Sequence, residues 1–280
     1  MKLAIRYRAV FRYEREAGLS PHHVRLFPRR DAFTDVLDRK FMVDGNADVQ
    51  YRQDLFDNET AVCFFPRSLR ELNIVLDLEL LLRERNPFHF LLAKHALTLP
   101  LTYLPGEAEA LAPYLGAGEG VFTLPAEFLV PPGTPTVDAL VGLNAAVPQL
   151  VRYEHREEGD PFSPEETLRR GSGSCRDSAV LFLEVCRRQG LAARLVSGFL
   201  WEEETGERKA DNALHEWVEA YLPGAGWVGM DPSCGVFADH HRIPAAVGIR
   251  HSQVAPVEGH YYGNEAIAST LETSLNISPI

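Results

Sequence analysis

Cysteine is scarce in this sequence, and what there is forms no familiar framework. The chain holds four cysteines, Cys63, Cys175, Cys186 and Cys234, too few and too irregularly spaced for the disulfide pattern of a secreted domain. No CxxC pair occurs. A zinc site made from these cysteines and some of the ten histidines stays an alternative, but the short ligand spacing of such sites is missing, so we expect no metal site. The sequence therefore favours reduced thiols in a cytoplasmic protein.

Long apolar runs and an excess of basic charge are also missing. The apolar stretch at residues 72–82 is interrupted by Asp77 and Glu79, short of the roughly 18 residues that a membrane span needs. Residues 1–16 carry scattered basic side chains instead of a basic start followed by an apolar segment, which argues against a secretory signal. A formal net charge of −11 would repel phosphate backbones. We expect neither membrane nor nucleic acid as a partner.

What is present is an ordinary globular composition. Hydrophobic residues make up 45%, charged residues 24% and aromatic residues 10% of the 280 residues, which excludes disordered, collagen-like and coiled-coil chains. At roughly 150 residues per domain, the length allows about two domains. We therefore looked for a boundary within the chain.

The two halves of the chain differ in pattern. Residues 2–82 alternate apolar and polar side chains between turn signals, which predicts a hairpin-rich antiparallel β-sandwich. Residues 86–135 are dense in proline and glycine and should hold little long helix. We place the boundary there, which gives an N-terminal β-rich domain at residues 1–130 and a second domain, with C-terminal strands, at residues 131–280.

Helical signals begin after this boundary. Apolar residues recur at helical intervals from Thr136, where Pro148 is expected to kink the helix or end its first segment. A second helix is predicted after Ser163, a capping residue followed by Pro164 at the first helical position. Glycines at 171 and 173 end it.

The next helix starts with a cysteine. Ser174 is a good N-cap, Asp177 brings a carboxylate to the first turn, and Cys175, Ala179 and Cys186 recur on one face. Free backbone N–H groups and the positive end of the helix dipole favour a thiolate at such a position. Cys175 is therefore a candidate nucleophile, whereas Cys186, three turns deeper, is expected to pack in the core.

A histidine and an aspartate follow on a predicted hairpin with strands at residues 215–222 and 226–231. If Tyr221 pairs with Trp227, Asp231 lies diagonal to His215 on one face, close enough for carboxylate and imidazole to meet. A register shifted by one residue would separate them. We predict the first register.

The motifs GSCRDSA at 173–179 and HEWVEAYLPGAGWVGMDPSCG at 215–235, with SPHHVRLFPR and DLFDN earlier, resemble the transglutaminase-like superfamily. The resemblance is to the bacterial type, in which an N-terminal β domain precedes a transglutaminase core. It implies an α+β chain whose papain-like core packs a cysteine-bearing helix on an antiparallel sheet. It also implies that Cys175 is the nucleophile, His215 the general base and acid, and Asp231 the orienting carboxylate. One departure is Asp57 in DLFDN, where the family pattern has glycine.

The function expected from these residues is thiol-dependent acyl transfer. Such an enzyme would cleave or exchange peptide or isopeptide amide bonds through a thioester on Cys175, with no cofactor and with a peptide or protein as substrate. Hydrolysis and transamidation stay open, as do the oligomeric state and the second oxyanion donor. The alternative is a catalytically silent interaction module of the same fold. Cys234 is interpreted as structural, and the pairs His22–His23 and His240–His241 as solvated loop residues.

Overall fold

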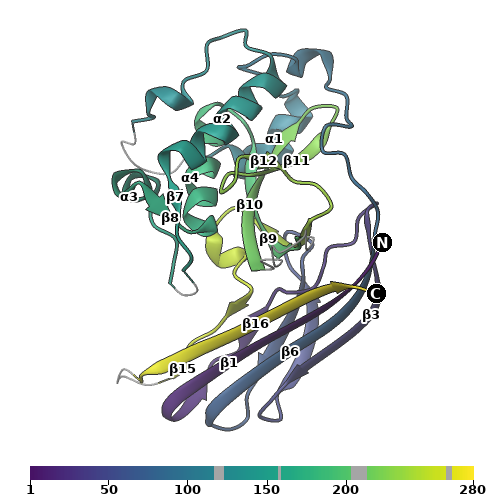
Figure 1. Cartoon of the computed structure of the whole chain (residues 1–280), viewed down its shortest axis with the longest axis vertical. Coiled ribbons are helices and arrows are strands. Elements are labelled where there is room, and N and C mark those ends of the chain that lie inside the picture. Colours follow the sequence, from purple (N-terminus) through teal and green to yellow (C-terminus); the bar gives the residue numbers. More distant parts are fainter. Residues whose placement is uncertain (117–122, 157–158, 203–212, 263–266) are drawn as a thin grey trace, which may run out of the picture.

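The structure is a computed structural model that describes residues 1–116, 123–156, 159–202, 213–262 and 267–280. Its elements in chain order are β1 (Lys2–Leu19), β2 (His22–Val24), β3 (Thr34–Val43), β4 (Asp48–Gln53), β5 (Glu59–Phe64), β6 (Leu69–Leu82), η1 (Lys94–Ala96), α1 (Pro105–Leu115), η2 (Ala126–Phe128), α2 (Thr136–Leu150), β7 (Arg152–Tyr153), α3 (Pro164–Arg170), β8 (Ser172–Gly173), α4 (Cys175–Arg188), β9 (Ala193–Leu200), β10 (Ala213–Leu222), β11 (Gly226–Asp231), β12 (Val236–Phe237), β13 (Arg242–Gly248), η3 (His251–Gln253), β14 (Val257–Glu258), β15 (Tyr261–Tyr262) and β16 (Ser269–Pro279). The long strands form one end of the molecule and the helices gather at the other (Figure 1).

The first half of the chain forms the predicted antiparallel β-sandwich. One sheet has the order β15-β1-β6-β3, with β16 also paired to β1, and the facing sheet has the order β14-β2-β5-β4. Alternate apolar residues of β1 and β6, such as Leu3, Ile5, Leu72 and Ile74, are buried in the core of the sandwich. Period-two alternation in the sequence thus becomes one buried face for each strand.

The core of the second half packs α4 against an antiparallel sheet of the order β12-β11-β10-β9-β13. Apolar residues of α4, among them Phe182 and Cys186, share one cluster with Val218 and Ala220 of β10. This arrangement and the sandwich together confirm the predicted α+β class. Among the described residues, no helix combines the length and the apolar character that crossing a membrane would need.

The three helices predicted in the second half are α2, α3 and α4. Pro148 lies near the end of α2 and does not interrupt it. Ser163 caps α3, with its Oγ accepting from the Glu166 amide at 3.2 Å, and Gly171 ends that helix with φ of 62°. The sequence did not single out α1, which begins at Pro105 within the proline-rich stretch.

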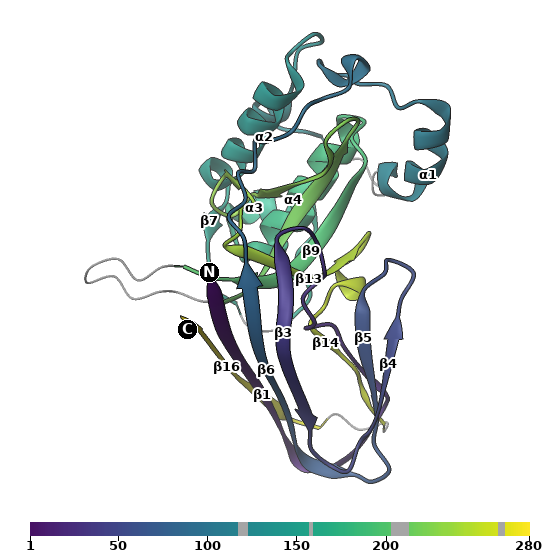
Figure 2. The same cartoon turned by 90° about the vertical axis from the view of Figure 1, so that its right-hand side faces the viewer.

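Strand pairing joins the two ends of the chain. The last three strands, β14, β15 and β16, pair with β2 and β1 of the sandwich instead of with the sheet that packs on α4. Conversely, Leu99, Leu101 and Phe128 pack in the cluster that surrounds α4. The sandwich therefore contains strands from both ends of the chain, and residues before 130 contribute to the core of the second half. Figure 2 shows β16 beside β1.

The sandwich reaches the core through the DLFDN turn between β4 and β5. Phe56 packs on a cluster that includes Trp217 and Val247. Asn58 is buried, and its side chain bonds both the Val247 amide (2.8 Å) and carbonyl (2.7 Å). Asp57, where the family pattern has glycine, takes a left-handed φ of 61°, the conformation that glycine adopts most easily.

Candidate active site

A buried carboxylate fixes the start of α4. Asp177 Oδ2 accepts from the Ser174 amide at 2.6 Å and from the Ser174 hydroxyl at 2.7 Å. Its other oxygen accepts from the Phe162 amide and from Arg156 Nη2, both at 2.7 Å. Burial alone would raise the pKa of Asp177, but these hydrogen bonds outweigh it and lower the pKa. Asp177 is thus a charged cap, as predicted, and it sets the position of Cys175 on the first turn.

Gly173 permits this close approach. A Cβ at this position would lie 2.7 Å from the Cβ of Asp177, nearer than non-bonded carbon atoms can sit. The glycine before the capping serine is therefore required by packing rather than by a special backbone angle.

The hairpin of β10 and β11 has the predicted register. Tyr221 pairs with Trp227, and Val218 with Met230, which brings His215 and Asp231 to the same face. His215 Nε2 donates to Asp231 Oδ2 at 2.8 Å. Asp231 is 0% and His215 7% exposed, so the contact is shielded from water. A slip of one residue in this register would break the pair.

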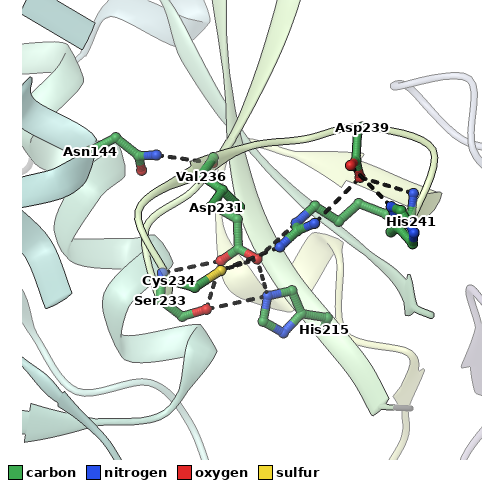
Figure 3. Close-up of polar contacts among 9 residues, drawn as sticks. Asn144, His215, Asp231, Ser233, Cys234, Val236, Asp239 and His241 are labelled. Carbon is green, nitrogen blue, oxygen red and sulfur yellow. Dashed lines mark hydrogen bonds and ion pairs between the residues drawn. The ribbon is translucent and has the colours of Figure 1, made fainter. Parts of the chain in front are cut away.

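Asp231 collects further donors from the loop after β11 and from β13. Ser233 donates to Oδ1 from its hydroxyl at 2.6 Å and from its amide at 3.1 Å. Arg242 Nε donates to Oδ2 at 2.9 Å and Cys234 Sγ at 3.3 Å. Figure 3 shows Ser233, Cys234 and His215 arranged around the Asp231 carboxylate. Both oxygens of the Asp231 carboxylate therefore accept hydrogen bonds, which fix its orientation.

These contacts set the charges of the pair. Burial opposes ionisation of Asp231, but the positive charges of His215 and Arg242 and the hydrogen bonds lower its pKa well below its usual range. Burial likewise disfavours the His215 cation, yet Asp231 and Cys175 raise the pKa of His215 well above its usual value. The geometry therefore favours an imidazolium beside a carboxylate.

Cys175 is a neighbour of the His215 imidazole. Its side chain is hydrogen-bonded to His215, and it is half-buried, so it keeps contact with solvent. Because Nε2 is taken by Asp231, Nδ1 is the ring nitrogen left to exchange a proton with sulfur. The three side chains predicted from the sequence thus form a connected series, Cys175 to His215 to Asp231.

An aromatic layer supports the imidazole. The ring of Trp217 stacks on that of His215, with centroids 6.3 Å apart and planes inclined by 24°. Trp217 is buried and belongs to the cluster on which Phe56 of the sandwich packs. The N-terminal domain therefore contacts the cluster that contains the ring beside His215.

The remaining cysteines differ in environment. Cys63 and Cys186 are buried, and burial raises their pKa values to about 11 and about 12, so they are poor nucleophiles. Cys234, interpreted from the sequence as structural, is exposed and touches Asp231 and Arg242 at 3.3 Å each. Its thiol pKa is raised by burial of the sulfur and by the Asp231 charge.

Sequence reasoning missed Arg242 and the roles of Ser233 and Cys234. Ser233 follows Asp231 so closely that a side-chain turn could have been foreseen. Arg242 lies on β13, which pairs with β9 and not with β11. No local pattern links that strand to Asp231, so only the folded sheet reveals the contact.

Two cavities of about 220 and 440 Å³ lie on either side of Trp227, at the turn end of the β10–β11 hairpin. Neither is lined by Cys175, His215 or Asp231. The candidate chemistry therefore sits at the opposite end of this hairpin from these cavities.

Known families match both halves of the chain. Residues 125–232 match the model of the transglutaminase-like superfamily, and residues 3–80 match that of the bacterial transglutaminase-like N-terminal region. The chain belongs to the transglutaminase-like superfamily. The first match contains all three residues of the Cys175 series, and the second covers most of the sandwich strands.

Sequence relatives of this transglutaminase-like chain are uncharacterised. One, from Mycobacterium leprae (strain TN), is 32% identical over 103 residues, 36% of this chain and 36% of the relative. Another, from Mycobacterium tuberculosis (strain ATCC 25618 / H37Rv), is 27% identical over 155 residues, 53% of this chain and 49% of the relative. The match thus spans at most about half the length of these relatives.

A solved structure shares the complete fold. The crystal structure of a protein from Cytophaga hutchinsonii, described as a candidate cysteine protease, superposes with a TM-score of 0.74. The superposition covers 99% of this chain and 90% of that one at 15% sequence identity. At this identity the likeness concerns the fold, and it includes both the sandwich and the transglutaminase-like core.

Proposed function

We propose that the protein is a thiol-dependent acyl-transfer enzyme that acts on peptide or isopeptide amide bonds. The observation that carries the proposal is the connected series in which Cys175, on the first turn of α4, interacts with the imidazole of His215 while Asp231 accepts from its Nε2. A buried structural histidine needs no half-exposed thiol on one side and no ionised carboxylate on the other. Membership of the transglutaminase-like superfamily supports the same reading.

Acylation begins with the Cys175 thiolate. The sulfur attacks the amide carbonyl carbon, and the carbonyl electron pair moves to oxygen, where the backbone N–H of Cys175 at the start of α4 is placed to stabilise it. As the tetrahedral species collapses, the C–N bond breaks and His215 Nδ1 gives its proton to the departing amine. A thioester on Cys175 and a neutral imidazole result.

Deacylation reverses the proton flow. Neutral His215 removes a proton from the acceptor, which attacks the thioester carbonyl and releases the Cys175 thiolate. Water as acceptor gives a peptidase or amidase, and an amine such as a lysine side chain gives transamidation. In both half-reactions Asp231 holds the proton on Nε2 of the imidazole, so that Nδ1 faces the sulfur and exchanges the second proton.

The substrate and compartment follow from the same chemistry. A peptide or protein is the expected acyl donor, because the half-buried Cys175 is accessible to solvent and neither of the two cavities is lined by the three side chains. All four cysteines are free thiols, which supports a reducing, cytoplasmic location.

Selective alkylation tests whether the thiol is activated. Iodoacetamide below pH 8 should label Cys175 faster than Cys63, Cys186 or Cys234, with the sites resolved by peptide mass spectrometry. The His215→Ala variant should lose this preference, while His89→Ala, an exposed histidine away from the site, should keep it. Equal labelling of Cys175 and Cys234 in the wild type would instead support a silent interaction module.

Trapping the acyl-enzyme identifies the reaction. A peptide library incubated briefly with the protein and quenched in acid should leave an adduct on Cys175, and Cys175→Ala should leave none. A parallel reaction that is not quenched and contains a primary amine, with Cys175→Ala as the blank, then separates the two outcomes. Amine incorporation shows transamidation, and release of free acid alone rejects it.

A further inference from the structure

A second cluster of chemically capable side chains lies in the segment between β12 and β13. Asp239, His240 and His241 each present one ligand atom, and these atoms lie within 4.8 Å of one another. Asp239 Oδ2 and His241 Nδ1 are 3.0 Å apart. The sequence interpreted the two histidines as solvated loop residues, but both are half-buried in the structure.

The atom that distinguishes this cluster from an ordinary polar turn is His240 Nδ1. It is buried and has no hydrogen-bond partner among the described residues. A buried ring nitrogen without a partner is costly to the fold unless something binds it. The His240 ring centroid lies 4.3 Å from that of His241, so the ring with the unpartnered nitrogen belongs to the same cluster as the other two donors.

We propose that Asp239, His240 and His241 form a binding site for a divalent transition-metal ion of the Zn²⁺, Ni²⁺ or Cu²⁺ class. Imidazole nitrogen with one carboxylate oxygen is the donor set that these ions prefer, whereas Mg²⁺ and Ca²⁺ prefer oxygen alone. Metal–ligand bonds of about 2.0–2.2 Å in a tetrahedron place donors roughly 3.3 Å apart. Asp239 Oδ2 and His241 Nδ1, hydrogen-bonded at 3.0 Å, lie close to that spacing, so the metal would replace the proton between them, which is released to solvent, and His240 would close in.

The neighbouring Arg242 side chain limits the affinity of the site for a metal ion. Arg242 Nη1 lies 3.5 Å from Asp239 Oδ1, and its positive charge opposes a bound cation. We therefore expect weaker binding than at a structural zinc site, with the fourth position open to water. Arg242 also donates to Asp231. When Asp239 ligates a metal ion, the Arg242 guanidinium would keep its contacts with Asp231 and Cys234 and lose the one with Asp239.

Calorimetric titration with Zn²⁺ tests the site in the full chain. The titration uses the Cys175→Ala background, so that zinc on the candidate nucleophile is not counted. His240→Ala and Asp239→Asn should each weaken binding by at least about tenfold, since even indirect ligand contacts are worth that much. His89→Ala, which removes an exposed histidine elsewhere, should leave affinity unchanged. His240→Ala is expected to fold, because its Nδ1 has no described partner to lose.

Trp201 provides an independent signal. Its ring stacks on His241 with centroids 5.0 Å apart and planes inclined by 18°, so Cu²⁺ held by that imidazole should quench its fluorescence. Trp201→Phe should remove most of the quenching yet keep the calorimetric affinity. His241→Gln should remove both signals.

Three results would overturn the proposal. They are no zinc binding at millimolar concentration in the Cys175→Ala background, equal affinity in the His240→Ala and His89→Ala variants, or copper quenching that persists in Trp201→Phe. The first rejects the site altogether. The other two place the metal on different residues.

Discussion

Arg242 and His215 donate to the same oxygen of Asp231, at 2.9 and 2.8 Å. One carboxylate oxygen therefore lies between two positive side chains in a buried setting. Arg242 is itself mostly buried, so it acts on the proposed chemistry through Asp231. This makes it a positioning residue.

Replacing Arg242 should impair turnover more than substrate binding. We expect Arg242→Gln to lower kcat by about 10- to 100-fold, matching the roughly 1.5–3 kcal/mol of a hydrogen bond to a charged group, with KM little changed. Arg242→Lys should recover part of the loss, because it restores the charge but not the fork of donors. Steady-state kinetics, on a peptide substrate identified by trapping the acyl-enzyme, provides the measurement. A rise in KM alone would assign Arg242 to substrate binding.

Removing the charge of Asp231 should move the alkaline limb of the pH–rate profile. Asp231 raises the pKa of His215, so the wild-type imidazolium persists to higher pH, and Asp231→Asn should shift the limb to lower pH. Turnover should also fall, by up to about 10⁴-fold on the serine-protease precedent. Arg242→Gln should shift the limb the opposite way, because it removes a nearby positive charge.

The exposed Asp48→Asn exchange serves as the control for this pH series and should leave the profile in place. If the alkaline limb of the pH–rate profile has the same midpoint in the wild type and in Asp231→Asn, ionisation of His215 does not determine that limb.

The glycine before Ser174 should be intolerant of a methyl group. Gly173→Ala forces a Cβ against Asp177, and we expect the free energy of unfolding to fall by about 1–3 kcal/mol, as for other overpacked sites. Gly142→Ala is the matched control, since a Cβ there meets nothing within 4 Å in α2. That change should raise stability by about 0.5–1 kcal/mol. Urea denaturation measures the free energy of unfolding of both variants. A Gly173→Ala variant as stable as the wild type would contradict the packing argument.

The DLFDN turn should prefer a glycine at position 57. Asp57 has φ of 61°, so Asp57→Gly should be neutral or stabilising by up to about 1 kcal/mol. Asp57→Val should destabilise by about 1–2 kcal/mol, because a β-branched residue tolerates that conformation poorly. Thermal unfolding measures both changes. Stability that is equal in the two variants would show that the turn relaxes to another conformation.

Local patterns were sufficient to predict most of the fold. Alternation predicted the sandwich, and the caps at Ser163 and Ser174 predicted the starts of α3 and α4. The pairing of β16 with β1 was missed, because it joins residues more than 250 positions apart and leaves no short-range mark in the sequence. The helix α1 was missed because prolines around it resemble a loop signal, although Pro105 occupies a first helical position.

The candidate site was predictable to the extent that its geometry follows from strand register. One assumption, that Tyr221 pairs with Trp227, brings His215 and Asp231 together. The contacts of Arg242 depend on how β13 lies across β9 from the hairpin, a tertiary relation that spacing does not encode. The same holds for the packing of Phe56 on the cluster that contains Trp217, which joins segments far apart in the sequence.

The pairing of β1 with β16 has a consequence for synthesis on the ribosome. β1 is made first, yet residues 269–279 that cover one of its edges emerge only after α4 and its sheet. Until then that edge exposes unpaired backbone groups, which can attract strands from other chains. The sandwich therefore stays incomplete until residue 279 has emerged, and a nascent chain stalled before residue 269 should be far more prone to aggregation than one released after residue 279.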